Sequence, residues 1–400
     1  MPPTLDGYVT RATSLTDFDV NGVHILCGKK AQIFSGFGNE TSPAEADKKL
    51  YIGESITVYG SLRNKSHTMC ATKIITHQAQ VQEISGFGII DRVFSHSSDL
   101  AASGTLLIRA DGYPMQINAK TASAFEPPLK SLSDVRTNLW VRFQGKQRAD
   151  GVVIATKANF FSNAMSRSEN NLDSKLNYDP TAVDASKQQS ELSKAFLGLK
   201  LKRIPPYKDA VMQARVNRIG ESLVPQYQRA LPATDATKIN FRFQLIDSNQ
   251  RHDAVDLPSG IILVPKQVVE RLQNDSQLAA VLADNIASVL EKQLYRQLPT
   301  YRTLEAASLV SAASGVGLAV VGVNAGVWGS IVRQAEEQSG RVSLGLLQDA
   351  GYDIHEAPRA WWLLAPKNPQ KIVNIRMPQR AAYLYHMLGT TWPPDSPAQR

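Results

Sequence analysis

Short apolar runs separated by Gly, Asp, Asn and Ser fill the first 160 residues of the chain. Runs of this length between turn-forming residues predict β-strands. The pattern also repeats: residues 50–60 precede an Ala-Thr-Lys strand at 71–73, and roughly 85 residues later 139–145 precede another at 155–157. Two copies of so small a unit predict two small barrels rather than one sandwich.

The pattern of apolar and polar residues changes twice in the rest of the chain. Residues 162–195 are polar and contain too few apolar side chains to fold alone, which predicts a linker. From residue 196 onward apolar positions recur at helical spacing, interrupted by a predicted meander of three short strands between 238 and 264. The expected fold class is therefore multidomain, with two all-β barrels followed by a mostly helical α+β domain. The expected boundaries are 1–80 for the first barrel, 81–161 for the second barrel, 162–195 for the linker and 196–400 for the last domain.

Composition excludes several classes of protein. The chain is 43% hydrophobic and 20% charged, which argues against a disordered chain, a collagen-like repeat or a polytopic membrane protein. The 44 Lys and Arg outnumber the 36 Asp and Glu by 8, but they are spread thinly and form no polybasic arm. We therefore expect no specific nucleic-acid partner.

One stretch, residues 306–332, carries no charge and is long enough to span a bilayer. Its many Gly, Ala and Ser residues make it only mildly hydrophobic. We favour a helical hairpin that is buried or in peripheral contact with a membrane, with a spanning helix as the alternative.

The two cysteines, Cys27 and Cys70, both lie in strand-like runs. They form a disulfide if those strands are neighbours, which would imply an oxidising compartment, or they are two separate buried thiols. No secretory leader is visible before the first strand. The barrel units resemble the small OB-like barrels of bacterial exported proteins, which favours a periplasmic location, with the cytoplasm as the alternative.

The last domain resembles a known family by the order of its elements. A helix, a strand ending in Leu257-Pro258-Ser259-Gly260 and a long helix that begins near Leu278 come first. Gly351-Tyr352-Asp353 and then Trp361-Trp362 follow later in the chain. Over residues 200–390 this order is similar to the gluzincin zinc peptidases of the HtpX and CAAX-prenyl-protease type.

The resemblance also implies where the chemistry should lie. The family carries His-Glu-x-x-His on its long helix and Glu-x-x-x-Asp on a later one, which supply three zinc ligands and a general base. Here Asp284-Asn285-Ile286-Ala287-Ser288 stands in place of the first motif, while Gln338 falls at the third ligand and Gly340 at the Asp. These side chains offer too little charge for zinc, and Asn285 cannot take a proton from water. The sequence thus predicts a degenerate site with no catalytic residue, no metal and no cofactor.

A peptidase scaffold without its metal keeps one useful feature, the edge strand that holds peptides by main-chain hydrogen bonds. We expect Val255, Asp256 and Leu257, with the turn at Ser259-Gly260, to bind an extended peptide or protein segment. The occupant could be the chain's own Pro-rich tail from Thr391 onward. The expected function is therefore binding or scaffolding by an inactive metallopeptidase-like protein.

Two alternative functions remain open. The first is an active zinc metalloendopeptidase that uses other ligands. The second is oligonucleotide or glycan binding by the barrels, for which Tyr59, Trp140 and Phe143 are candidate stacking residues. These aromatic side chains would instead fill the two small barrel cores if they point inward.

Overall fold

The fold is taken from a computed structural model of the full chain. The structure describes residues 4–37, 40–43, 49–63, 68–77, 83–94, 104–167, 169–170, 179–182, 204–247, 253–296, 325–365 and 376–393.

The first barrel is a closed ring of five strands in the order β1-β2-β3-β6-β5 and back to β1. Their bounds are β1 (Thr4–Ser14), β2 (Asp17–Val20), β3 (Val23–Phe37), β5 (Ser55–Arg63) and β6 (Thr68–Thr76), and β4 (Glu40–Pro43) extends β3 as a hairpin. Alternating apolar residues point inward, and the fully buried core comprises Val9, Phe18, Val20, Ile25, Ile56, Val58, Met69 and Ile74.

The second barrel repeats this connection, as the sequence repeat predicts. Its ring runs β7-β8-β9-β12-β11 and back to β7, and in both barrels the third and last strands pair in parallel. The bounds are β7 (Glu83–Val93), β8 (Leu106–Ala110), β9 (Tyr113–Ile117), β10 (Ala122–Phe125), β11 (Trp140–Gln147) and β12 (Val153–Phe161).

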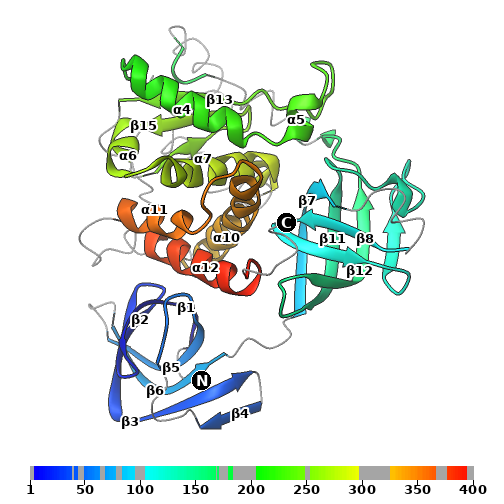
Figure 1. Ribbon diagram of the computed structural model, residues 1–400. Coiled ribbons are helices and arrows are strands. Elements are labelled where there is room, and N and C mark those ends of the chain that lie inside the picture. The colour runs from blue at the N-terminus through cyan, green and yellow to red at the C-terminus, as the bar shows by residue number, and fades with distance from the viewer. Residues whose placement is uncertain are drawn as a thin grey trace.

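The carboxy-terminal region surrounds one buried helix, α7 (Asp275–Leu290). The Asn274 side chain caps its first turn by accepting a hydrogen bond from the backbone N of Gln277 at 2.8 Å. The other helices are α4 (Ala210–Leu223), α5 (Gln226–Ala230), α6 (Lys266–Arg271), α10 (Ala325–Asp349), α11 (Glu356–Leu364) and α12 (Arg376–Thr390). Figure 1 shows α11 and α12 between the α4–α7 layer and the first barrel, with the second barrel to the side of α10 and α12.

The three strands of this region do not form the predicted meander. β13 (Arg242–Ile246) pairs in parallel with β15 (Ile261–Pro265), and β14 (Val255–Asp256) lies antiparallel at the outer side of β15. The connection from β13 to β14 is long enough to carry the chain past the place of β15, so strand order differs from chain order.

The predicted linker begins with residues that pack. Asn163 is buried, accepts a hydrogen bond from Trp140 Nε1 at 2.6 Å, and its backbone carbonyl accepts one from Lys292 Nζ at 3.0 Å. The tract is therefore attached to both neighbours at its start. Residues 171–178 and 183–203 lie outside the described residues, so the linker and the domain boundaries stay predictions.

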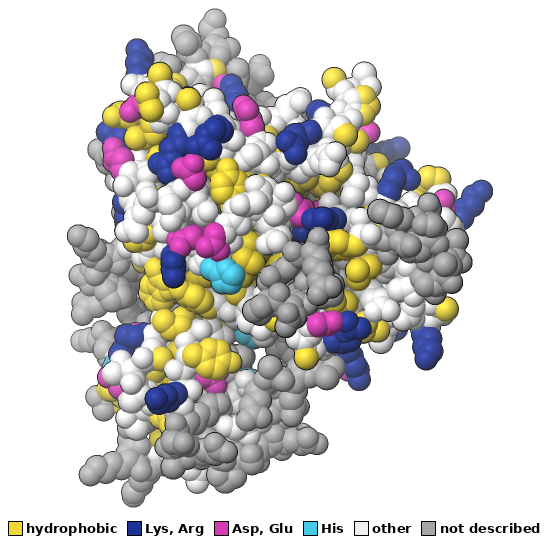
Figure 2. Space-filling model, in the orientation of Figure 1, with side chains coloured by type: hydrophobic (Ala, Val, Ile, Leu, Met, Phe, Trp, Pro, Cys, Tyr) yellow, Lys and Arg dark blue, Asp and Glu magenta, His cyan; other side chains and the backbone are white. Residues whose placement is uncertain are grey.

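The uncharged stretch 306–332 lies mostly outside the described residues, apart from the first turns of α10. Among the helices that the structure describes, none combines the length and the apolar character needed to cross a bilayer. On the face drawn in Figure 2, Lys and Arg side chains are scattered rather than gathered into one patch.

Candidate functional site

The positions of the family's first motif lie on the inner face of α7. Asp284 and Asn285 are buried, while Ser288 is half-buried one turn later. The Asn285 amide turns back on its own helix and donates to the carbonyl of Val281 at 2.8 Å. Ser288 Oγ donates to Asp256 Oδ2 at 2.8 Å, which joins α7 to the edge strand β14.

A guanidinium group lies against Asp284. Arg380 of α12 is nearly buried; it donates from Nη2 to Asp284 Oδ2 and from Nη1 to Asp253 Oδ2 at 2.9 Å. Its Cζ atom lies 3.4 Å from the centroid of the Trp361 ring. Burial opposes the positive charge, yet Asp284 and Asp253 hold the pKa of Arg380 above its ordinary value. Arg380 is thus a fixed cation bonded to Asp284, the residue aligned with the family's first ligand.

The acidic groups around this cation are shielded from water. Burial raises the pKa of Asp284, while the charge of Arg380 and hydrogen bonds from Arg380 and from Ser339 Oγ at 3.0 Å oppose the rise. Burial likewise raises the pKa of Asp256 to about 6, against the hydrogen bond from Ser288. Both shifts follow from the cost of a carboxylate charge in a low-dielectric site.

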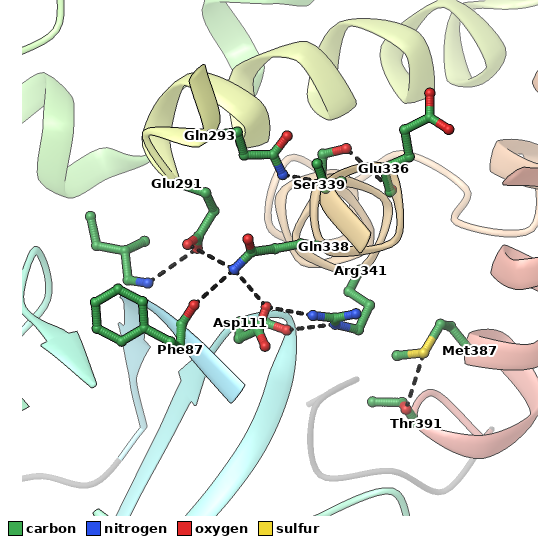
Figure 3. A network of polar contacts seen from close by, with 12 residues as sticks. Phe87, Asp111, Glu291, Gln293, Glu336, Gln338, Ser339, Arg341, Met387 and Thr391 are labelled. Atoms are coloured by element: carbon green, nitrogen blue, oxygen red, sulfur yellow. Dashed lines mark hydrogen bonds and ion pairs between the residues drawn. The ribbon is translucent and has the colours of Figure 1, made fainter. Parts of the chain in front are cut away.

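The third-ligand assignment to Gln338 is corrected by the structure. Gln338 Nε2 donates to the Phe87 carbonyl, Asp111 Oδ1 and Glu291 Oε2 at 2.9 to 3.1 Å, so the side chain points at the second barrel (Figure 3). The next residue, Ser339, bonds Asp284 instead. Successive helical residues diverge by about 100°, so Gln338 and Ser339 cannot share a face.

Glu336 fits the third position better than Gln338. Glu336 lies one turn before Ser339, on the same face of α10. It also stands four residues before Gly340, which is the spacing of Glu and Asp in the family's Glu-x-x-x-Asp motif. Its carboxylate is paired with Arg376, which lies one helical turn before Arg380 on α12. Two arginines of α12 therefore engage the first and third ligand positions.

These residues do not fit zinc. The α7 face offers one carboxylate and one hydroxyl, and the carboxylate is bonded to a guanidinium group. Within the described parts of the chain, no three His, Cys, Asp or Glu residues are grouped so that they could hold one metal ion. The Asn285 amide, bonded to its own helix, has no proton-accepting group for a general base.

The edge strand lies where the sequence predicts it. Val255 and Asp256 face Leu263 and Ile262 of β15, so the other side of β14 is the outer side of the described sheet. Leu257 is buried, and its N–H donates to Ile261 O at 2.8 Å. Gly260 closes the turn with a φ of +89°, a conformation that favours glycine.

The carboxy-terminal tail does not follow β14 as far as the structure describes it. Thr391 and Trp392 are buried against the second barrel, where Gln147 Nε2 donates to Thr391 Oγ1 at 3.0 Å. The Trp392 ring lies 6.0 Å from the Arg109 guanidinium carbon. These two residues of the tail therefore lie against the second barrel, and binding of the tail to β14 stays a prediction. Residues 394–400 are outside the described part.

The cysteines lie on neighbouring strands, one residue out of register. The β3–β6 register places Cys70 opposite Leu26, and Cys27 opposite Ala71. Cys70 is a half-buried free thiol. The side chain of Cys27 lies outside the described part of the structure, so the disulfide stays a prediction.

Two of the three candidate stacking aromatics of the barrels are buried. Trp140 is 5% exposed and stacks on Phe87, and Phe143 is 1% exposed in the core. Tyr59 is half-buried, with Lys73 Nζ 5.7 Å from its ring centroid. Trp140 and Phe143 therefore fill the barrel rather than offer a free ring face for base stacking.

Arg380 is the functional residue that sequence reasoning missed. The available signal was its place in α12, since it falls among Met377, Ala381 and Leu384, which are all buried. An arginine on the apolar face of a helix needs a buried acidic partner. The sequence did not reveal which acid that would be.

Comparison with known proteins agrees with the resemblance of the last domain. Residues 211–396 match the model of peptidase family M48. The β-barrel assembly-enhancing proteases of Escherichia coli (strain K12) and Shigella flexneri are each 24% identical over 167 residues, covering 38% of this chain and 33% of theirs. The chain thus spans about a third of the length of these curated relatives. The carboxy-terminal region of this chain is a gluzincin-type member of peptidase family M48.

Proposed function

We propose that the carboxy-terminal region is a catalytically inactive metallopeptidase-like domain that binds an extended protein segment. The observation that carries the proposal is the guanidinium group of Arg380, bonded to Asp284 where an active member would place a zinc ligand. A metal ion at this position would meet a fixed positive charge, and its first ligand would already be engaged. The absence of a general base at Asn285 points in the same direction.

Peptide binding needs only the scaffold. The outer side of β14 presents main-chain groups to an extended segment, and Ser288 and Asp256 secure the strand to α7 from behind. The short strand offers few such groups, so specificity would come from side chains on either side of the strand. We propose an extended protein segment as the partner, acting in binding or scaffolding.

The experiment asks whether Arg380 excludes the metal. Three substitutions, Asp284→His, Asn285→Glu and Ser288→His, restore the family motif beside the Glu336 already present. We expect this triple variant to bind zinc well below one equivalent, and to bind close to one equivalent when Arg380→Met is added. Elemental analysis after dialysis measures both variants, and Arg359→Met in place of Arg380→Met is the matched control.

The active-enzyme alternative makes the opposite prediction for the unmodified protein. One equivalent of zinc and peptide cleavage that a chelator abolishes would overturn the inactive assignment. Zinc binding by the triple variant with Arg380 in place would instead refute the proposal that Arg380 excludes the metal ion. Failure of the fourfold variant to bind zinc would discredit the alignment with Asp284 and Ser288.

A second candidate function belongs to the second barrel. The ring order with parallel third and last strands is consistent with an OB-like barrel. A hollow of about 400 Å³ lies over β7, β11 and β12, with Phe87, Arg142 and Lys157 in its wall. Arg142 lies 5.0 Å from the Phe87 ring centroid. A cation and a ring together would suit a single-stranded oligonucleotide.

The oligonucleotide function is tested by titrating a fluorescent single strand into the full chain at low and high salt. Salt-sensitive binding that Arg142→Gln weakens would support it. Binding that this variant does not change would exclude the hollow as the site.

We also propose an exported location. The relatives are named for enhancing β-barrel assembly, and membrane-spanning β-barrels of the bacterial kind lie in the outer membrane. A related partner would place this chain in the periplasm. Fractionation of cells that express the full natural gene tests the location, and recovery with cytoplasmic markers would contradict it.

A further inference from the structure

A cavity of about 540 Å³ lies where both barrels meet α10 and α12. Its lining does not include Asp284, and its wall is built from three parts of the molecule. Tyr8 comes from β1 of the first barrel, Tyr113 from β9 of the second, and Tyr383 from α12. Cavities of this size at domain junctions are typical of small-ligand sites.

The aromatic part of the wall is packed and oriented. The Tyr8 ring lies 5.6 Å from that of Tyr383 and 4.8 Å from that of His386, measured between centroids. Tyr383 Oη accepts a hydrogen bond from Arg341 Nη1 at 2.8 Å. Burial lowers the pKa of His386 to about 4, so this ring is neutral near pH 7. The His386 ring therefore adds no positive charge to that of Arg341, whose guanidinium carbon lies 5.1 Å from the Tyr113 ring centroid.

The charged part of the wall has an excess of acid. Glu83 and Glu337 both line the cavity, and Arg341 is the one cation beside them in its described lining. The charge of Arg341 is already matched by Asp111, whose Oδ1 lies 2.7 Å from Nη2. Glu337, whose side chain is 24% exposed, pairs with Arg333 at 3.7 Å, and Arg333 is itself largely exposed. The charge of Arg341 also acts on Glu337, although its hydrogen bond goes to Asp111.

The electrostatics of the tyrosines agree with this geometry. Burial is the main cause that raises the pKa of Tyr8 and of Tyr383; the negative charge of Glu337 adds to the rise, and the positive charge of Arg341 opposes it. The Glu337 charge, which disfavours a phenolate, would favour a positive ligand. Aromatic rings with a carboxylate beside them recognise ammonium and guanidinium groups.

We propose that this junction cavity binds an organic cation, a guanidinium or ammonium group, between the tyrosine rings and Glu337. The charged group belongs either to a basic side chain of a peptide or to a free amine. Because Tyr8, Tyr113 and Tyr383 come from different modules, an occupant would also bind the two barrels to the helices. The site does not depend on the state of Asp284 and so stands apart from the proposed function.

The test compares ligands that differ in charge alone. Nα-acetyl-arginine amide is titrated into the full chain by calorimetry, with Nα-acetyl-citrulline amide as the neutral analogue of the same shape. We expect the arginine compound to bind at least about tenfold more tightly than the citrulline compound. Agmatine, which lacks the peptide groups, separates the two sources: equal binding favours a free amine, and weaker binding favours a peptide side chain.

Substitutions in the cavity wall test whether the ligand binds there. Glu337→Gln, which keeps the shape of the side chain, and Tyr8→Leu should each weaken binding about three- to tenfold. Glu270→Gln on the exposed face of α6 and Tyr51→Leu, at 63% exposure on the first barrel, are the matched controls and should change nothing. Equal affinity for the citrulline compound, no binding at millimolar concentration, or unchanged binding by Glu337→Gln would each overturn the proposal.

Discussion

At the residue scale, Arg380 is the side chain on which the α7–α12 interface depends. Arg380→Met removes the cation from two acids, of which Asp284 is buried and Asp253 is largely covered. We expect a loss of about 3–5 kcal/mol of unfolding free energy, because a buried charge left without its partner is costly. Urea unfolding at pH 7 measures it. Arg359→Met removes an exposed arginine from Glu356, which keeps its hydrogen bonds from Asn274 and Gln277, and should cost much less. Equal losses in unfolding free energy would contradict the importance assigned to Arg380.

A second residue-scale prediction concerns Asp256. Its folded-state pKa, about 6, lies above the ordinary value of 3.8, so the folded protein binds more protons than the unfolded chain between these pH values. The unfolding free energy should therefore fall as pH rises from about 4 to 6. Asp256→Asn should flatten this fall and stabilise the protein by about 1–2 kcal/mol at pH 7.

Denaturant unfolding at several pH values gives the Asp256 result, and Asp247→Asn, an exposed acid paired with Lys266 at 3.4 Å, is the control. A variant with the same pH profile as the unmodified protein would mean that Asp256 does not titrate in this window.

At the scale of elements, a glycine lets α10 approach the second barrel. A Cβ atom on Gly345 would lie 2.6 Å from Cζ of Arg109, whose guanidinium is already held by Asp91 and Asp349. Gly345→Ala should therefore destabilise the protein by about 1–3 kcal/mol. Gly389→Ala in the last turn of α12 meets nothing within 4 Å and should stabilise it by about 0.5–1 kcal/mol. Thermal unfolding of both variants tests the pair, and a harmless Gly345→Ala would mean that the helix can shift.

At the scale of the whole molecule, buried polar contacts hold the second barrel to the M48 region. Arg109 is fully buried and bridges Asp91 of the barrel to Asp349 of α10. Gln338 adds hydrogen bonds to the Phe87 carbonyl and to Asp111. These contacts do not depend on the polar tract that connects the two parts in sequence.

We therefore expect a protease cut in the polar tract to leave the two fragments associated. The polar composition predicts cleavage between residues 171 and 195, and native gel filtration should then show one species. Arg109→Met should release the barrel fragment after cleavage, because it leaves buried Asp91 unpaired. Arg148→Met, at an exposed pair with Asp150, is the control. Separation of the fragments from unmodified protein would show that the interface is weak.

The sequence by itself determined the features that rest on local patterns. Strand-length apolar runs and their repeat predicted two barrels, and the order of elements in the last domain predicted the long helix near Leu278, which is α7. The order of elements also predicted a gluzincin peptidase of the HtpX and CAAX-prenyl-protease type for the last region, and residues 211–396 match the model of peptidase family M48. Such features depend on neighbours within a few residues or on a repeat that is visible in the chain.

Only the tertiary structure decided which partners the side chains of the candidate site contact. Arg380 and Asp284 lie 96 residues apart in sequence, and no local pattern joins them. One step along α10 separates Ser339, which bonds Asp284, from Gln338, which bonds the second barrel. The strand register between Cys27 and Cys70 and the burial of Trp392 were decided in the same way. Side-chain direction follows from how helices and sheets pack, and that packing is set by contacts between segments distant in the chain.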